Sequence, residues 1–106
     1  MTGVDPKTID YSRIENGEAR LLPHLLLFVY GLRGYRSQPV SYDHICRYFA
    51  ATSHEFVCQT VRDAWYYDGY LEGVACDPTA TYRVKCPRYF RLTRSGLGIL
   101  EQRRAL

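Results

Sequence analysis

The stretch SHEFVCQTVRDAWYYDGYLEG, residues 53–73, contains the clearest structural signal in this chain of 106 residues. Thr52 followed three positions later by Glu55 has the spacing of a capping box, which predicts that a helix begins just after Thr52. Gly69 tolerates the positive φ at which many helices end. The predicted buried stripe of this helix consists of Val57, Cys58, Val61, Ala64 and Trp65. The stretch therefore predicts a helix over 53–68 that turns directly into a strand.

Two further helices are predicted before this stretch. Residues 18–32 are apolar almost all round, which is typical of a helix at the centre of a core or in an interface. Pro23 is tolerated only in a first turn, so it predicts a start a few residues later than Glu18. Ser41 is a good N-cap for a short helix over 42–49. Pro39 cannot donate to a ladder, so a strand just before Ser41 would lie at a sheet edge.

A hairpin and a last helix are predicted after the stretch. Residues 70–75 and 81–85 read as two strands, and the second alternates apolar with basic side chains. Residues 89–92 extend the second strand beyond an interruption at Pro87. Thr93 is a good N-cap for a helix from Arg94 to about Arg104.

Length and composition indicate one small folded domain. A hydrophobic content of 46% and an aromatic content of 14% are those of a globular chain. We expect a flexible N-terminal arm over 1–16 and one domain over 17–106, of an α+β class that is mainly α. The longest apolar run, residues 25–30, is too short to span a bilayer, and the N-terminus has no signal-peptide pattern. We therefore expect a cytoplasmic protein with no membrane partner and with reduced thiols.

Charge is divided unevenly along the chain. Residues 1–82 carry seven basic and ten acidic side chains, whereas residues 83–106 carry seven basic side chains and one acidic. No acidic residue lies between Arg83 and Arg94. A block of one sign is a candidate surface for phosphate, and the alternative is a solvated strand with no partner.

The order of these elements resembles the winged helix-turn-helix family of transcriptional regulators, of the MarR or PadR kind. The resemblance covers about residues 18–106. It is carried by the third helix with Trp65 four residues before Gly69, by the sequence DGYL at 68–71, and by FRLTRSG at 90–96. The last of these is similar to the family's Y-x-L-T-x-x-G lead into the final helix, with Phe90 in place of Tyr. The resemblance implies a three-helix core, a wing of two or three strands and a C-terminal helix.

The resemblance also implies duplex DNA binding, with helix 53–68 in the major groove and the basic wing, residues 82–91, on the backbone or in the minor groove. Four side chains would face base edges: His54, Glu55, Gln59 and Arg62. Thr52 and Ser53 would contact phosphates at the helix N-terminus, as would Arg83, Lys85 and Arg88 from the wing. A homodimer through the first and last helices would match two half-sites.

A second function remains open from the sequence alone. The candidate recognition helix carries Glu55, Asp63 and Asp68 but only one arginine and no lysine, a balance that a phosphate-lined groove disfavours. The alternative is a winged-helix protein–protein interaction module without nucleic-acid binding, for example a phage or mobile-element protein that binds and inhibits a host complex. Phe56, Tyr66 and Tyr67 would then be contact aromatics.

Catalytic and metal sites find little support in the sequence. There is no glycine-rich phosphate loop and no nucleophile motif, so we expect no enzyme, no catalytic residues and no cofactor. The four cysteines contain no C-x2-C pair, so we expect no metal site. Cys46 and Cys58 are interpreted as buried small hydrophobes, and Cys76 and Cys86 as two inert thiols or, alternatively, a redox or metal switch across the hairpin.

Overall fold

The computed structural model describes residues 5–33, 39–74 and 87–103. Within these ranges the chain forms four α-helices and one three-stranded antiparallel sheet, which confirms the expected α+β, mainly helical class. The helices are α1 (Gly17–Arg33), α2 (Tyr42–Tyr48), α3 (His54–Arg62) and α4 (Arg94–Gln102), with 3-10 turns η1 (Pro6–Thr8) and η2 (Tyr11–Arg13) and a π-helical turn η3 (Asp63–Tyr67). The strands are β1 (Val40–Ser41), β2 (Leu71–Val74) and β3 (Tyr89–Leu92).

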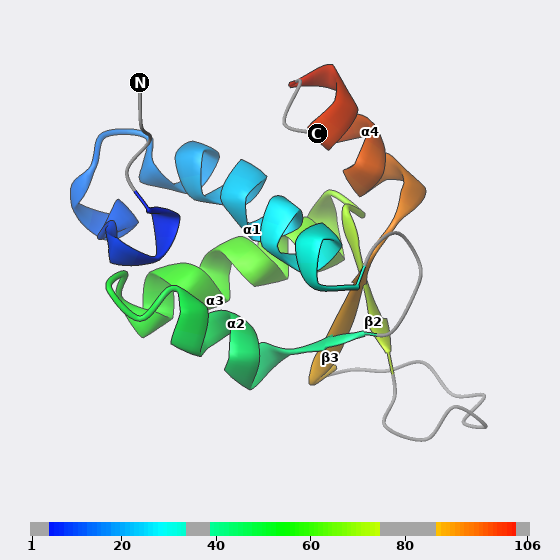
Figure 1. Ribbon diagram of the computed structural model, residues 1–106, viewed down its shortest axis with the longest axis horizontal. Coiled ribbons are helices and arrows are strands. Elements are labelled where there is room, and N and C mark those ends of the chain that lie inside the picture. Colours follow the sequence, from blue (N-terminus) through cyan, green and yellow to red (C-terminus); the bar gives the residue numbers. More distant parts are fainter. Residues whose placement is uncertain (1–4, 34–38, 75–86, 104–106) are drawn as a thin grey trace.

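Helix α1 lies at the centre of the molecule. Figure 1 shows it between α4 on one side and α3 on the other, and it also packs against β3. Its fully buried side chains are Leu21, Leu25, Leu26 and Val29. The helix begins at Gly17, earlier than Pro23 predicted. Pro23 costs one backbone hydrogen bond, to the carbonyl of Ala19, but Ala19 is exposed and its carbonyl can bond to water instead.

Residues 5–16, which we expected to form part of a flexible arm, pack against the rest of the molecule. Tyr11 is only 2% exposed and belongs to the core, with its ring beside those of His24 and Phe49. Asn16, at φ 59°, turns the chain into α1. A Cβ on Gly17 would collide with the carbonyl oxygen of Tyr11, so this close approach requires glycine.

The helix pair α2 and α3 forms close to the predicted boundaries. The Ser41 hydroxyl accepts a hydrogen bond from the amide of His44 at 3.1 Å, which confirms Ser41 as the N-cap of α2. Ile45 and Phe49 are fully buried, and α2 packs against α3.

The predicted helix over 53–68 ends at the expected residue but changes geometry in its last turn. The amide of Asp68 donates to the carbonyl of Asp63 at 2.9 Å, an i to i+5 bond. Gly69 then adopts a φ of 70° and the chain enters β2. The wider turn buries Ala64 completely while it leaves Tyr66 and Tyr67 in solvent.

The sheet has the order β1-β3-β2, so β1 is an edge strand as Pro39 predicted. Phe90 and Leu92 of β3 face the core. Thr93 caps α4 by accepting from the amide of Gly96 and donates to the carbonyl of Gly69 at 2.6 Å, which ties the start of α4 to the end of η3. The predicted strand over 81–85 lies outside the described residues. None of the described helices has the length and apolar character needed to cross a bilayer.

Candidate nucleic-acid interface

The N-terminus of α3 is capped differently from the prediction. Ser53, not Thr52, is the N-cap, and its hydroxyl accepts from the amide of Phe56 at 3.3 Å. Thr52 is only 3% exposed; its hydroxyl accepts from the amide of Tyr11 at 3.1 Å and donates to the carbonyl of Ile9 at 2.9 Å. Thr52 thus fastens the N-terminal segment to the helix pair. The predicted capping box and the predicted phosphate contact of Thr52 are therefore both wrong, because the Thr52 hydroxyl is buried and bonded to the N-terminal segment.

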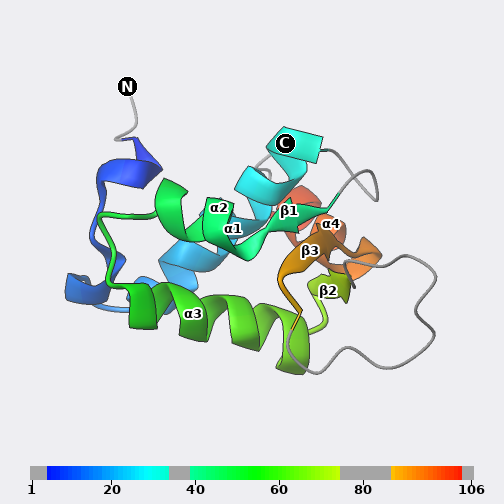
Figure 2. The same ribbon diagram turned by 90° about the horizontal axis from the view of Figure 1, so that it is seen from below.

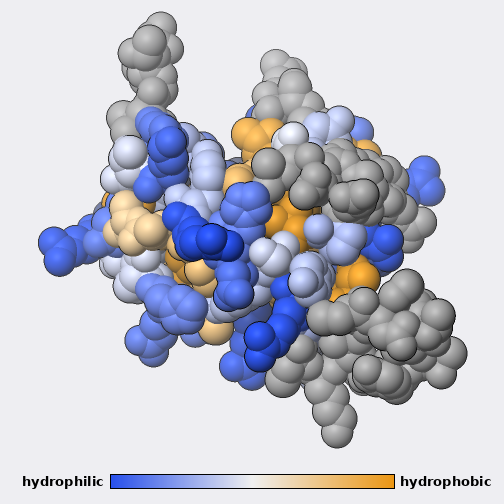
Figure 3. Space-filling model, turned by 60° about the horizontal axis from the view of Figure 1, so that its bottom comes forward, coloured by the Kyte–Doolittle hydropathy of each residue, from blue (hydrophilic) through white to orange (hydrophobic). Residues whose placement is uncertain are grey.

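Helix α3 presents a continuous polar face to solvent. Figure 2 shows it along one edge of the molecule, with α1 and α2 on its inner side. The buried residues are Val57, Thr60 and Val61. The exposed residues are Ser53, His54, Glu55, Cys58, Gln59 and Arg62, so every side chain predicted to read bases is accessible. Figure 3, in which the bottom of Figure 1 comes forward, shows mainly hydrophilic side chains over this part of the surface.

The boundary of the buried face differs from the predicted stripe at Cys58. The stripe placed Cys58 inside, whereas the structure exposes it and buries Thr60 on the other side of Val57. The Thr60 hydroxyl donates to the carbonyl of Phe56 at 3.0 Å, which satisfies its polar atom within the helix. Its methyl group can then pack in the core.

The charge of the α3 face is balanced rather than basic. Glu55 and Arg62 are both exposed and offset one another. Arg47 of α2 is also exposed; its Nε donates to the carbonyl of Asp43 at 3.4 Å, and it lines a surface hollow with His44 and Tyr48. Arg47 is not among the predicted site residues, although its position in the last turn of the capped helix α2 could have indicated it.

The predicted wing is described only in part. Arg83 and Lys85 lie outside the described residues. Arg88 is exposed, and its carbonyl accepts from the amide of Tyr42 at 2.7 Å, which holds the end of the wing segment at the start of α2. Arg88 is therefore fixed beside the helix pair.

Arg91, another residue of the basic block, is neutralised by an ion pair between two strands of the sheet. Arg91 of β3 lies directly opposite Glu72 of β2, and their side chains form an ion pair at 2.9 Å. The charge of Arg91 is therefore already offset, while Arg94 at the start of α4 is exposed. The basic block between Arg83 and Arg94 offers less unpaired charge than its sequence suggests.

Two thiols and two aromatic rings meet where α2 packs against α3. The rings of Tyr42 and His54 are 6.0 Å apart in an edge-to-face arrangement. Burial raises the pKa of Tyr42, and the neighbouring thiols of Cys58 and Cys46 raise that pKa further. Burial also raises the pKa of the half-buried Cys46 thiol. The spacing of four residues within each helix is the signal that could have predicted this cluster.

No group of three or more metal-binding side chains lies together within residues 5–33, 39–74 and 87–103. Cys76 and Cys86 are outside those ranges, so the alternative of a switch across the hairpin is not described by the structure.

The π-helical turn η3, which directly follows α3, is aromatic. The half-buried Trp65 packs edge to face on Phe90 of β3, with ring centroids 6.2 Å apart. Tyr66 and Tyr67 follow in η3 and are 56% and 67% exposed, with their rings 5.0 Å apart. These two tyrosines are large apolar groups left in solvent, a feature typical of contact surfaces.

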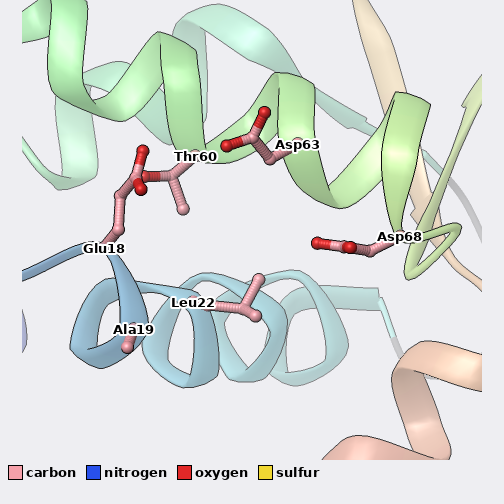
Figure 4. A pocket seen from close by; sticks show the side chains of 6 residues that line it. All are labelled: Glu18, Ala19, Leu22, Thr60, Asp63 and Asp68. Atoms are coloured by element: carbon pink, nitrogen blue, oxygen red, sulfur yellow. The ribbon is translucent and has the colours of Figure 1, made fainter. Parts of the chain in front are cut away.

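A groove of about 250 Å³ separates α1 from the end of α3 (Figure 4). It is lined by Glu18, Ala19, Leu22, Thr60, Asp63 and Asp68. Among the described residues none of its three carboxylates forms an ion pair. Like charge makes this side of α3 unfavourable for phosphate, so only the opposite, outward face can approach a nucleic acid.

Comparisons of this chain with protein-family models, with curated proteins and with solved structures find no match.

Proposed function

We propose that this protein is a winged helix-turn-helix regulator that binds duplex DNA through α3. The observation that carries the proposal is the polar outward face of α3, held by a buried inner face and preceded by the capped helix α2. The sheet and α4 follow in the order of that fold, and Arg88 is fixed beside α2. This arrangement supports insertion of α3 into a major groove while the wing contacts the backbone.

Some of the proposed contacts provide sequence specificity and others provide affinity. Arg62 pairs with guanine, Gln59 with adenine and Glu55 with cytosine, since these side chains match those base edges. Ser53 and His54 lie at the helix N-terminus, which favours phosphate. Arg47, Arg88, Arg83 and Lys85 supply the charge that the α3 face lacks.

The test is duplex affinity, measured by fluorescence anisotropy on a site selected from a random pool. Arg62→Ala should weaken binding about 5- to 150-fold, which corresponds to about 1–3 kcal/mol for a bidentate base contact. Arg20→Ala is the matched control. Arg20 is exposed on α1, on the side away from Glu18 and Leu22, which face α3, so the same loss of charge should change affinity less than about twofold.

Salt dependence tests the role of the sheet and wing. Glu72→Gln removes the partner of Arg91, so binding should strengthen on all duplexes and the slope of affinity against salt should steepen by about one ion. Absence of duplex binding at low salt would end the DNA proposal. Equal losses from Arg62→Ala and Arg20→Ala would show that α3 is not the reading element.

The proposal includes a homodimer through α1 and α4. These helices pack against each other within one chain, and each keeps half-buried apolar side chains at the edge of the core: Leu27 on α1, Leu97 and Ile99 on α4. Leu97→Glu should convert a dimer to a monomer in sedimentation analysis and weaken binding to a two-half-site operator far more than to one half-site. A wild-type monomer at micromolar concentration would contradict this part.

The second candidate is a protein-interaction module, favoured by the exposed pair Tyr66 and Tyr67. In that case Tyr66→Ser with Tyr67→Ser should abolish partner binding, while the helix and sheet remain folded because neither ring is buried. Under the DNA proposal the same double variant should keep its duplex affinity within about twofold, since the tyrosines lie beyond the base-reading half of α3.

A further inference from the structure

A hollow of about 290 Å³, the aromatic groove, lies between α1, α2 and the N-terminal turn η1. The rings of Phe28 on α1 and Tyr48 on α2 stack with their centroids 4.1 Å apart, which joins the two helices at this surface. Both rings are half-buried, so each keeps part of its surface in solvent. The residues that line the groove are Pro6, His24, Leu27, Phe28, Gly31 and Tyr48.

The aromatic groove adjoins a second hollow, which is lined by His44, Arg47 and Tyr48. Tyr48 lines both hollows, and the His44 ring packs edge to face on Phe28 with centroids 5.5 Å apart. Arg47 is exposed and forms no ion pair within the part of the chain that the structure describes. The described residues that line the two hollows include no carboxylate, so the charge beside the aromatic groove is positive.

The core uses only part of the apolar surface of α1. The fully buried side chains of this helix lie on another face, whereas Leu27 and Phe28 are half-buried beside the groove. Gly31 is exposed, and a Cβ on it would meet no atom within 4 Å, so the space next to it is open. A helix that keeps apolar surface beyond its buried face is typical of one that contacts a partner.

We propose that the aromatic groove binds an acidic peptide segment of a partner protein, which places one large apolar side chain beside Phe28 and a carboxylate on Arg47. The size of the groove supports a single apolar side chain, since a cavity of about 150 Å³ already accommodates benzene, while whole small-molecule pockets begin at about 300 Å³. This inference goes beyond the proposed function and does not depend on DNA binding.

Charge decides the sign of the partner. The Nε of Arg47 donates to the carbonyl of Asp43, and the donors of its two terminal nitrogens remain for a carboxylate. A basic segment would be repelled by Arg47. It would be drawn instead to the groove between α1 and α3, which three carboxylates line. An apolar anchor with an acidic neighbour therefore fits the aromatic groove and no other groove described above.

The experiment selects binders to the full-length chain from a displayed pool of random peptides. The expected result is a set of enriched peptides that share one leucine, phenylalanine or tryptophan close to an aspartate or glutamate. The strongest peptide is then synthesised with a fluorescent label and titrated by anisotropy. Changing its acidic residues to the matching amides should weaken binding at least about fivefold, the value of a charge-assisted contact. This selection uses the wild-type protein and needs no variant to fold.

Two variants with matched controls locate the bound peptide. Gly31→Phe fills the aromatic groove and should weaken peptide binding at least about tenfold, because the anchor loses its place. Gly98→Phe is its control: its Cβ is equally open, but Gly98 lies on α4 in a different hollow, so affinity should change less than about twofold. Arg47→Ala should weaken binding at least about fivefold, and its control Arg94→Ala, exposed on α4, less than about twofold.

Three results would overturn the proposal. One is a selection that enriches no peptide, and another is a selection that enriches peptides with basic residues beside the anchor. The third is an equal effect of Gly31→Phe and Gly98→Phe while circular dichroism shows both variants folded.

Discussion

Replacing Thr52 with valine removes one hydroxyl and keeps the shape of the side chain. That hydroxyl satisfies two backbone groups more than forty positions away in sequence, the buried amide of Tyr11 and the partly buried carbonyl of Ile9. A buried polar group left without a partner costs about 1–3 kcal/mol, and less where water can enter. The Tyr11 amide carries most of that cost because it is fully enclosed. We therefore expect Thr52→Val to lower the free energy of unfolding by about 2–4 kcal/mol and the thermal midpoint by at least roughly 8 °C.

The assay is urea unfolding followed by Trp65 fluorescence, together with hydrogen exchange at the Tyr11 amide. Ser53→Ala is the matched control. It deletes the neighbouring hydroxyl, which caps α3, and should cost about 1 kcal/mol without exposing the Tyr11 amide. Thr52→Val should cost at least twice as much and should speed exchange at Tyr11 selectively. If the two variants lose equal stability and the Tyr11 amide keeps its protection, Thr52 does not hold the N-terminal segment.

Two further predictions concern stability. A Cβ at Gly98 of α4 meets no atom within 4 Å, so Gly98→Ala should stabilise the protein by about 0.5–1 kcal/mol. A Cβ at Gly96 would press into the carbonyl oxygen of Tyr70, so Gly96→Ala should destabilise the protein by about 1–3 kcal/mol. Urea midpoints that move in the same direction for both variants would refute this prediction. Burial lowers the pKa of His24 below its usual 6.5, so the unfolded chain binds this proton more readily than the folded one, and stability falls as the pH drops below about 6.5. His24→Gln should flatten that part of the stability profile between about pH 7 and pH 5.5, and an unchanged slope would show that His24 does not carry it.

The sequence predicts local structure best where one residue satisfies its own neighbours. Ser41 and Thr93 each accept from an amide three residues later, and Gly69 adopts the positive φ expected of it. These signals depend only on the residues next to them, so α2, α4 and the end of η3 are found with nearly correct boundaries.

Thr52 illustrates what spacing cannot reveal. Its distance from Glu55 fits a capping box, and nothing nearby in sequence distinguishes that role from a tertiary one. Its hydroxyl bonds instead to the backbone of Tyr11 and Ile9, which belong to a segment whose own sequence predicts no regular structure. Once Thr52 turns inward, Ser53 takes the cap one position later. The same limit explains the wrong prediction that Cys58 is buried. The structure buries Thr60 instead, and a hydrophobic pattern does not count a threonine whose hydroxyl is satisfied within its own helix.

Charge is the property that changes most between sequence and structure. The basic block reads as a single phosphate-facing surface, yet pairing in the sheet matches Arg91 to Glu72 and removes one of its charges. On the other side of α3, Glu18, Asp63 and Asp68 gather around one groove although they are far apart in sequence. The carboxylates that disfavoured DNA binding therefore divide: Asp63 and Asp68 lie toward α1, and Glu55 alone remains on the outward face. A helix with one acidic and one basic side chain on its exposed face can discriminate between bases, but it supplies little affinity. Under the DNA proposal, duplex binding must then draw its affinity from Arg47, Arg88 and the wing, so its salt dependence should change with those residues and its sequence preference with Gln59 and Arg62.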